Sequence, residues 1–331
     1  MYRGKHIRHR RAWVIATWSV ILLAVILLLI PFIEPYRLEV ETVQLTSYDL
    51  ATGPQPLRIV YVSDFCQGGW PYLTQSRANG IINQINNLNA DLVLLGGEYA
   101  ANPEDTITFF ENLPKIKAGH VYAVLGEMDR IDGISQKEKN AILKEKDPEG
   151  KLTQEQQEQL LNDTLRTKNN ERIKVLRDAL EAKNITLLVN ETVTVNYGDG
   201  GLITIVGIDE PIHGEPDLIS VAKQVKTSDY VILLGHNPSV IEDATRASDA
   251  DGRQDWFDLT LFGHTHGNQF FGSFNPLGIG TDVVTSSHRK GWVREVHDTP
   301  ILISRGVGTS VFPVRLGCVP QIHCIDVTSS K

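Results

Sequence analysis

The sequence lacks a basic cluster anywhere beyond its first eleven residues, and its formal net charge is −8. Because phosphate backbones attract basic surfaces, we expect no nucleic acid among its partners. Internal repeats and low-complexity tracts are also absent. The hydrophobic fraction of 41% and the charged fraction of 22% are those of a globular protein with ample apolar material for a core. The 331 residues suffice for one large domain or two small ones.

Cysteine is scarce, with three residues in the chain, too few to indicate the redox compartment. Cys318 and Cys324 are close in sequence and would be able to pair if the domain lies outside the cytosol. The alternative is that both are ordinary core residues flanking the last strand. The sequence leaves these two possibilities open.

One apolar run near the N-terminus differs in character from the rest. Residues 1–11 are basic and contain no acid, and residues 12–33 then form a nearly continuous apolar stretch without a charge, about the length that crosses a bilayer. Trp13 and Trp18 lie near one end of it and Tyr36 at the other, as interfacial anchors do. We therefore predict one transmembrane helix over residues 12–33 in contact with the membrane lipid bilayer.

The flanks of this run predict its orientation and processing. Basic residues before a span favour a cytoplasmic N-terminus, so we expect a single-pass plasma-membrane protein with an extracytoplasmic main domain. A cleaved signal peptide has a shorter apolar core and a small-residue cleavage site, which residues 30–35 do not offer. Arg10-Arg11 would also fit a twin-arginine export signal, but the sequence favours an uncleaved signal anchor.

Strand and helix patterns alternate after residues 34–55, which read as a linker. Ile81, Ile82, Ile85 and Leu88 recur at helical spacing between apolar runs that are typical of buried strands. This alternation predicts βαβ units and a largely parallel sheet in an α/β domain. The predicted strands are 57–62, 92–95, 120–125, 185–189, 192–197, 202–208, 230–234 and 259–262, followed by a β-like tail from residue 301 that includes 311–314 and 321–327.

Residues of about 133–170 interrupt the alternation with a segment rich in Lys, Glu, Gln and Asn, which predicts a charged helical insertion. Residues 145–156 faintly suggest a calcium-binding EF-hand loop, with Asp147, Glu149 and Gly150 at its third, fifth and sixth positions. Glu145 and Gln156 depart from the motif at its first and last positions, so a charged surface segment is the favoured interpretation.

Five strand patterns end in residues that can bind a metal ion. The endings are Ser63-Asp64-Phe65-Cys66, Gly96-Gly97-Glu98, Gly126-Glu127-Met128-Asp129, Gly235-His236-Asn237 and Gly263-His264-Thr265-His266-Gly267. In an α/β sheet the carboxyl ends of the strands converge on one crevice, where ligands bind. We therefore expect donors that are distant in sequence to meet at one point.

The order and spacing of these endings resemble the calcineurin-like metallophosphoesterase superfamily over about residues 56–330. Gly263 to Gln269, and Ser304-Arg305-Gly306-Val307-Gly308-Thr309-Ser310 through Arg315, resemble its membrane-associated or exported bacterial branch. The resemblance implies a four-layer α/β/β/α sandwich over residues 56–331, preceded here by the one N-terminal transmembrane helix. It also implies a metal-dependent phosphoesterase that hydrolyses phosphomonoesters or phosphodiesters with two divalent ions.

The same resemblance implies a ligand set. Asp64, Cys66 and His266 would hold one ion, Glu98 would bridge, and Glu127, His236 and His264 would hold the other. Cys66 stands where the family has His, Glu98 where it has Asp, and Glu127 where it has Asn. Since thiolate and carboxylate keep donor capacity, zinc, manganese or iron is expected at two sites, while one ion or none is the alternative.

Met128 stands at the position of the family's catalytic His. A thioether cannot donate a proton to a leaving oxygen, so this residue is not expected to function in catalysis. Asp129, which would orient that His, has nothing to orient. The extra carboxylate and thiolate would also cancel positive charge that stabilises the phosphoryl group, so we predict weak or specialised activity.

Two functions therefore stay open. The first is a membrane-anchored phosphoesterase with a remodelled dinuclear site, acting on a phosphorylated small molecule or lipid. The second is a non-catalytic descendant of the fold that serves as a binding or structural module in the cell envelope. Asn268 and Gln269 would line the substrate side or make loop hydrogen bonds. The remaining histidines considered, interpreted as surface or core residues, are His213, His288, His297 and His323.

Overall fold

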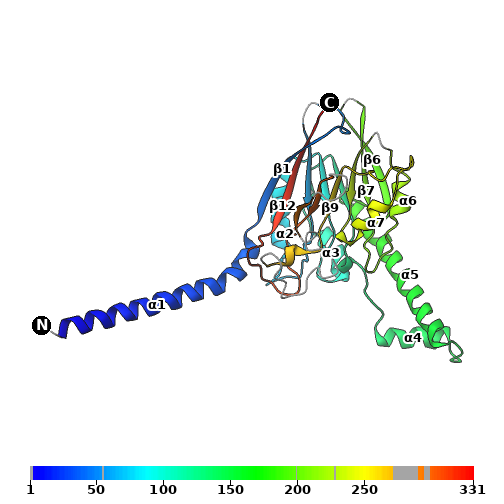
Figure 1. The fold of residues 1–331 in the computed structure, drawn as a ribbon. Helices are drawn as coiled ribbons and strands as arrows, with labels where there is room; N and C mark the ends of the chain where they lie inside the picture. Colours follow the sequence, from blue (N-terminus) through cyan, green and yellow to red (C-terminus); the bar gives the residue numbers. More distant parts are fainter. Residues whose placement is uncertain (1–2, 54–55, 199, 227–228, 271–289, 294–298) are drawn as a thin grey trace.

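A computed structural model describes residues 3–53, 56–198, 200–226, 229–270, 290–293 and 299–331 (Figure 1). Within these ranges the strands form two six-stranded sheets. The first sheet has the order β1 (Glu39–Ser47), β12 (Gln321–Ser329), β2 (Leu57–Val62), β3 (Leu92–Leu95), β4 (His120–Ala123), β5 (Thr186–Leu187). The second has the order β10 (Gly291–Val293), β11 (Ile301–Ile303), β9 (Leu259–Phe262), β8 (Tyr230–Leu234), β7 (Gly201–Gly207), β6 (Glu191–Tyr197).

Both sheets have a parallel centre, as the alternating pattern predicts. Strands β2 to β5 are mutually parallel, and so are β7, β8, β9 and β11. Antiparallel partners are added outside these centres, β12 beside β2, β6 beside β7 and β10 beside β11. The parallel centres are what bring the carboxyl ends of several strands to a common edge.

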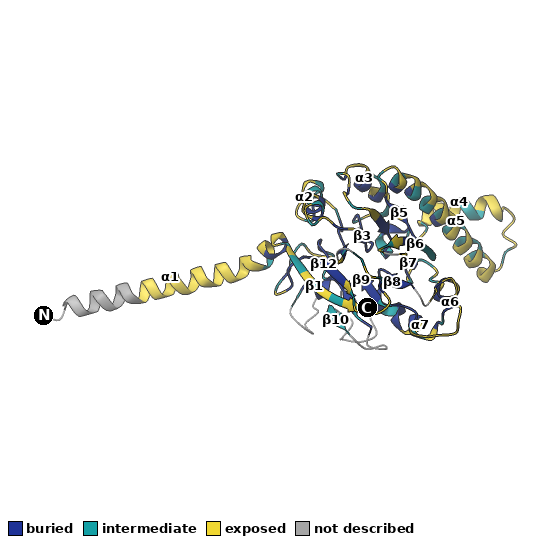
Figure 2. Cartoon of the chain, turned by 90° about the horizontal axis from the view of Figure 1, so that it is seen from above, coloured by how far each residue is buried: buried dark blue, intermediate teal, exposed yellow. Residues whose placement is uncertain are grey.

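Side-chain alternation along the strands builds three apolar layers. In β2, Val60 and Val62 pack on the helix side, while Ile59 and Tyr61 face the second sheet. The helix side of the first sheet is covered by α2 (Gln75–Asn86), α3 (Thr106–Glu111) and part of α5 (Gln154–Glu181). The outer face of the second sheet is covered by α6 (Leu218–Ala222) and α7 (Ile241–Arg246) (Figure 2). The predicted four-layer α/β/β/α sandwich is thereby confirmed.

Two sequence-based assignments of strand and linker are wrong. The segment 34–55 is not a plain linker, because β1 lies within it and pairs in parallel register with β12, from Glu39 opposite Gln321 to Ser47 opposite Ser329. Its half-buried alternation, seen at Val43 and Leu45, is an edge-strand pattern. Conversely, residues 311–314 form no strand, because their backbone bonds to a side chain instead.

The charged insertion folds into two helices, α4 (Gln136–Lys146) and α5, which project from the body in Figure 1. Helix α5 continues to Glu181, beyond the expected limit near residue 170, because Leu176 and Leu180 are buried against the first sheet. Between the helices, Asp147 accepts hydrogen bonds from the Lys151 and Leu152 N–H groups. The Asp147 side chain thus caps backbone N–H groups, and this segment does not form an EF-hand loop.

Helix α1 (Arg3–Ile33) is the apolar N-terminal segment, and it stands outside the domain (Figure 1). The stretch Trp13–Tyr36 has a mean hydropathy of 2.8, and none of its most apolar 18-residue segment is buried. Its length and composition suit a membrane span, and a signal sequence would meet the same criterion. A single 3₁₀ turn, Glu34–Tyr36, connects it towards β1.

The three cysteines are all free and buried. Cys318 and Cys324 are therefore two separate core thiols, the second of the two alternatives. Cys318 contacts the backbone of the last strand ending, since its Sγ lies 3.4 Å from the carbonyl oxygens of both His266 and Gly267.

Candidate metal centre

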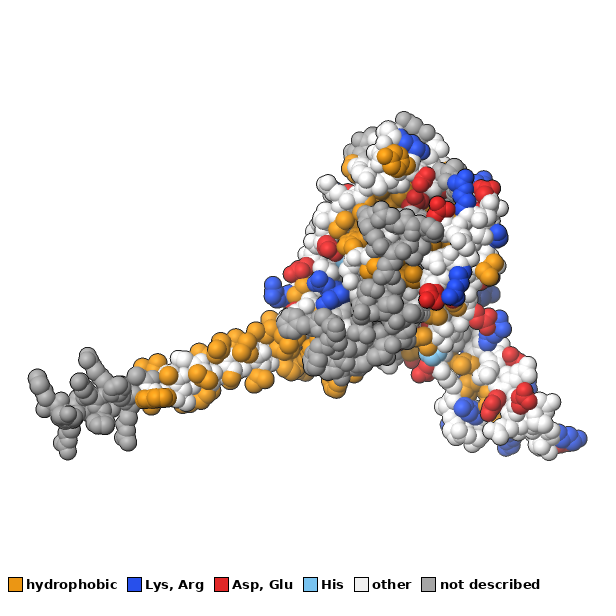
Figure 3. Space-filling view, viewed as in Figure 1, with side chains coloured by type: hydrophobic (Ala, Val, Ile, Leu, Met, Phe, Trp, Pro, Cys, Tyr) orange, Lys and Arg blue, Asp and Glu red, His pale blue; other side chains and the backbone are white. Residues whose placement is uncertain are grey.

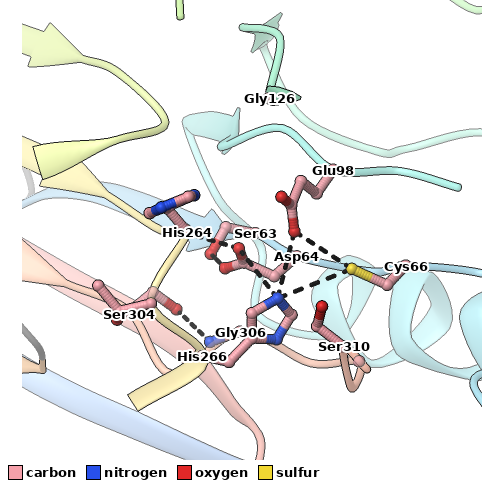
Figure 4. A network of polar contacts seen from close by, with 12 residues as sticks. Ser63, Asp64, Cys66, Glu98, Gly126, His264, His266, Ser304, Gly306 and Ser310 are labelled. Atoms are coloured by element: carbon pink, nitrogen blue, oxygen red, sulfur yellow. Dashed lines mark hydrogen bonds and ion pairs between the residues drawn. The ribbon is translucent and has the colours of Figure 1, made fainter. Parts of the chain in front are cut away.

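Donors from four strand ends meet around Glu98, as Figure 4 shows for Cys66 and His266. Glu98 Oε2 lies 3.3 Å from Cys66 Sγ and 3.2 Å from His266 Nε2. Its other carboxylate oxygen, Oε1, lies 3.4 Å from His236 Nε2. Donor atoms lie within 4.8 Å of one another in each of two groups, Cys66–Glu98–His266 and Glu98–His236–His264. Glu98 belongs to both groups, which is the arrangement a bridging ligand requires.

Asp64 and Glu127 flank these two groups. Asp64 Oδ1 lies 3.8 Å from His266 Nε2 and accepts a hydrogen bond from the His264 N–H at 2.7 Å. Glu127 Oε2 lies 3.9 Å from His264 Nδ1, and its side chain is 31% exposed. The structure thus brings the seven proposed donors to one region, with Glu127 as the member nearest to solvent.

The backbone of the donor residues adopts left-handed conformations that only glycine visits freely. The φ angles are 57° at Asp64, 44° at Cys66, 56° at Glu98, 68° at His264 and 49° at His266. Such conformations cost free energy and cluster at functional sites. This concentration is an independent reason to propose a site at the strand endings, and no sequence pattern predicted it.

Glycine allows the strand endings to approach one another. At Gly97, whose φ is 90°, an added Cβ would lie 2.6 Å from the Gly126 nitrogen and 2.8 Å from His236 Nδ1. At Gly306, with φ of 66°, an added Cβ would lie 2.5 Å from Asp64 Cβ. All three distances are shorter than real Cβ contacts essentially ever are, so a larger residue would push the donors apart.

The protonation states reflect a buried, crowded cluster. Burial lowers the pKa of His236, but the hydrogen bond and charge of Glu98 outweigh it and raise the pKa to about 10. Burial raises the pKa of Glu98, yet His236 and His266 together hold it well below its usual value. Burial first, and then the carboxylates of Glu98 and Asp64, raise the pKa of the Cys66 thiol well above its usual value.

The donor set fits divalent cations. His236 Nδ1 lies 2.6 Å from the Gly96 carbonyl oxygen, which leaves Nε2 as the donor that faces Glu98. A histidine ligand typically bonds through its second nitrogen to a carbonyl in this way. Nε2 of His236 is also buried and, apart from its 3.4 Å contact with Glu98 Oε1, has no hydrogen-bond partner among the described residues. A cation here would give that nitrogen a partner and offset the carboxylates that disfavour the Cys66 thiolate.

Asp129 has a structural role that differs from the expected one. One of its oxygens accepts hydrogen bonds from the N–H groups of Glu98, at 2.8 Å, and Gly126, at 2.9 Å. The other accepts from the Tyr99 N–H at 3.1 Å. The expectation that Asp129 has nothing to orient is therefore wrong, because it holds the turn that carries Glu98.

We predict that Asp129→Asn destabilises the protein, because an amide offers its donor group to an N–H that needs an acceptor. A loss of about 2–4 kcal/mol in the free energy of unfolding is expected, measured by urea denaturation. The exposed Asp163→Asn on α5 is the matched control and should change stability by less than about 0.5 kcal/mol. Equal stability of the two variants would contradict the proposed role of Asp129.

A cavity of about 740 Å³ opens beside the donors. Glu127 and Met128 line one part of it, and Ser135, Glu138 and Lys168 of the α4–α5 insertion line another. His213 also reaches this cavity. No function was predicted from the sequence for these insertion residues. A charged helical pattern does not show which part of the domain the helices will face.

Gln269 is fully buried and does not line a substrate surface. Its amide donates to the carbonyl oxygens of Phe312, at 3.2 Å, and Val314, at 3.0 Å, and its carbonyl accepts from the Ser310 N–H. Loop hydrogen bonding, the alternative use, is therefore correct for this side chain. Asn268 is equally buried, and its place on the substrate side stays a prediction.

Arg315, to which the sequence gave no role, is fully buried behind the donors. Its guanidinium donates to the carbonyl oxygens of Arg305, at 2.7 Å, and Cys318, at 3.1 Å, and also to that of Gly308. His323 is a core residue bonded to Glu41 and Ser304. His288 and His297 lie outside the described residues.

Comparison with known proteins identifies the class. The calcineurin-like phosphoesterase family matches residues 57–268, and the chain belongs to this family. It is 34% identical over 154 residues to the uncharacterized protein YpbG of Bacillus subtilis (strain 168), which covers 46% of this chain and 52% of that protein. An uncharacterized metallophosphoesterase of Campylobacter jejuni is 25% identical over 283 residues, 83% of this chain and 60% of its own length.

The chain spans about half the length of most of the curated relatives it matches. Two solved structures also resemble it. Phosphopantetheinyl hydrolase from Mycobacterium tuberculosis has a TM-score of 0.39 at 10% identity, covering 76% of this chain and 89% of that chain. NAD nucleotidase from Haemophilus influenzae has a TM-score of 0.41 at 12% identity, covering 76% of this chain and 48% of that chain.

Proposed function

We propose that this protein is a membrane-anchored, metal-dependent phosphoesterase with a remodelled dinuclear site. The observation that carries the proposal is the position of Glu98, whose two carboxylate oxygens face two separate sets of buried donors. Membership of the calcineurin-like phosphoesterase family supports hydrolysis of a phosphate ester as the reaction. If metal binding had been lost, random substitution would not be expected to leave metal-binding side chains at all seven proposed ligand positions.

The ligand roles are proposed from this arrangement. Asp64, Cys66 and His266 would hold one ion, His236, His264 and Glu127 would hold the other, and Glu98 would bridge them. Two divalent ions bound there, of zinc, manganese or iron, would supply Lewis acidity toward the phosphoryl oxygens and lower the pKa of water. The buried walls around Glu98 exclude bulk solvent and keep these donors in fixed geometry.

The chain's own residues limit the reaction. Met128 lines the cavity beside Glu127 but cannot donate a proton to a leaving oxygen. Three carboxylates and a thiolate among the proposed ligands also neutralise charge that would otherwise stabilise the phosphoryl group. We therefore expect slow turnover of simple esters, with the cavity between Met128 and Lys168 binding the non-reacting part of a preferred substrate.

The proposed location and substrate class are based on α1. We propose that α1 spans the plasma membrane with its basic N-terminus in the cytoplasm and the domain outside. A site tethered at the outer surface meets phosphorylated lipids as well as soluble phosphorylated small molecules, and we propose one of these as substrate. If turnover is unchanged by vesicle association and soluble esters react faster, the lipid is excluded.

The function is tested on the full chain in detergent by elemental analysis of bound metal and by hydrolysis of a generic bis-phosphodiester with added Mn²⁺ or Zn²⁺. Two bound ions together with turnover support the enzyme. Protein that binds one ion or none and does not hydrolyse the bis-phosphodiester instead supports a non-catalytic binding module with the same fold.

A further inference from the structure

An exposed apolar surface lies on the domain at two neighbouring loops. Trp70 is 82% exposed, and Val311 and Phe312 are each 54% exposed. The Tyr72 hydroxyl donates to the Val311 carbonyl oxygen at 3.0 Å and so joins the two loops. We call Trp70, Tyr72, Val311 and Phe312 the apolar rim. Large apolar side chains gathered at exposed loop tips indicate contact with a partner or a membrane.

The loop that carries Val311 and Phe312 is held in a defined conformation. Val311 has a φ of 60°, which is unfavourable for a β-branched residue. The buried amide of Gln269 holds the same loop at Ser310, Phe312 and Val314. The strained backbone of Val311 and the buried amide of Gln269 thus both hold the loop in which Val311 and Phe312 are exposed to solvent. Such an arrangement needs a function to retain it.

The rim adjoins the point where α1 enters the domain. The Arg315 N–H donates to the Pro31 carbonyl oxygen of α1 at 2.9 Å, four residues from Val311. The Glu34 carboxylate accepts the N–H groups of Gly317, at 2.9 Å, and Cys318, at 2.8 Å. The loop that carries Val311 and Phe312 is therefore bonded directly to the end of the apolar helix.

The second loop of the rim is fixed to the same junction. It leads through Thr74, the N-cap of α2, to Arg77. Arg77 donates to the Pro35 carbonyl oxygen at 2.7 Å, and its guanidinium lies 4.1 Å from the centre of the Tyr36 ring. In Figures 1 and 2 the junction lies beside β1 and α2, on the opposite side of the domain from α6 and α7.

We propose that the apolar rim docks on the bilayer surface beside α1 and orients the metal centre toward it. The occupant is lipid because both loops of the rim are bonded to the junction at the end of α1, where Phe32 and Ile33 are each 56% exposed. Figure 3 shows hydrophobic side chains along the described length of that helix. The proposal rests on the proposed span of α1, although not on catalysis.

Docking would bring the centre itself to the surface. The Trp70 loop begins directly after Cys66, and Gln269, which holds the Phe312 loop, lies three residues after His266. The Trp70 loop therefore extends from backbone that carries a proposed metal ligand, and the Phe312 loop is hydrogen-bonded to a side chain three residues from another. A substrate with an apolar part in the bilayer and a phosphate at the headgroup level would meet the centre without leaving the membrane.

The test places a nitroxide spin label on the full chain in lipid vesicles. Single cysteines are introduced as Phe312→Cys, Trp70→Cys, Leu22→Cys in α1 and Ile219→Cys in α6, the last an apolar residue that is 70% exposed on the far side. The three native cysteines are buried, and unsubstituted protein checks that they stay unlabelled. Collisions with oxygen, which partitions into lipid, are compared with those of a water-soluble nickel chelate.

Labels at Phe312 and Trp70 are expected to favour oxygen, as the Leu22 label does, while the Ile219 label favours the nickel chelate. Nickel-accessible labels at Phe312 and Trp70 beside a lipid-exposed Leu22 would overturn the docking proposal and leave the span intact. A nickel-accessible Leu22 would overturn both. Dipolar broadening at Phe312 that disappears on dilution with unlabelled protein would assign the rim to a second copy and also refute lipid docking.

Discussion

Glu98→Ala is expected to abolish stable binding of the second metal ion and to lower kcat by more than about a hundredfold, the scale on which single electrostatic groups act in catalytic sites. The reason is geometric. Glu98 is the one residue in both donor groups, since Oε2 faces Cys66 and His266 while Oε1 faces His236. Removing it separates two sites that its carboxylate joins. Elemental analysis and bis-phosphodiester hydrolysis measure the two effects on the same sample.

Glu111→Ala serves as the control, because Glu111 is exposed at the end of α3 and contacts none of the donors. It should keep wild-type metal content and turnover. Circular dichroism of Glu98→Ala is needed as well, since His236 loses a buried ion-pair partner in that variant. A folded Glu98→Ala protein with unchanged metal content would exclude Glu98 as the bridge, and with it the proposed dinuclear centre.

The strands and their endings were predictable because two local signals coincide. Apolar runs such as 92–95 and 230–234 mark buried strands, and each is followed at once by one or two glycines and then a polar residue. Parallel pairing then brings the endings within each sheet to one edge whatever the lengths between them. Glu98 follows β3 of the first sheet, whereas His236 and His266 follow β8 and β9 of the second, so their meeting also depends on how the two sheets pack against each other. Strand direction alone does not give that packing, and the four-layer sandwich implied by the family resemblance supplied it.

What the sequence concealed depends on partners distant along the chain. β1 is a strand because its backbone pairs with β12, almost the full chain length away, and its weak alternation resembles a polar linker until that partner is known. Asp129 was misjudged, and the use of Gln269 was left between two alternatives, for a related reason. Their side chains bond to backbone N–H and carbonyl groups. Every residue type has such groups, so the sequence does not indicate which of them a side chain will meet. The left-handed conformations at five proposed ligands were invisible in the same way.

Met128→His is expected to raise turnover by about a hundred- to ten-thousandfold, the range that general acid catalysis contributes. Met128 lines the cavity immediately beside Glu127, so an imidazole there would face bound substrate from the family's usual position. Its benefit should be greatest at low pH and fall as pH rises through the pKa of the new histidine, about 6.5 when unperturbed, because only the protonated ring can donate to the leaving oxygen. The pH profile of kcat measures this directly.

Two further substitutions separate proton donation from other effects. Met128→Gln supplies a hydrogen-bond donor that cannot titrate, so it should give a smaller gain without a pH dependence of its own. Combining Met128→His with Glu98→Ala should remove the gain, because an acid without the proposed bridge has no activated ester to protonate. If Met128→His binds metal normally yet gains nothing, the missing imidazole is not the limit. The negative charge of Asp64, Glu98, Glu127 and Cys66 around the centre would then be the limiting feature, and replacing Glu127 by the family's Asn would be expected to raise the rate instead.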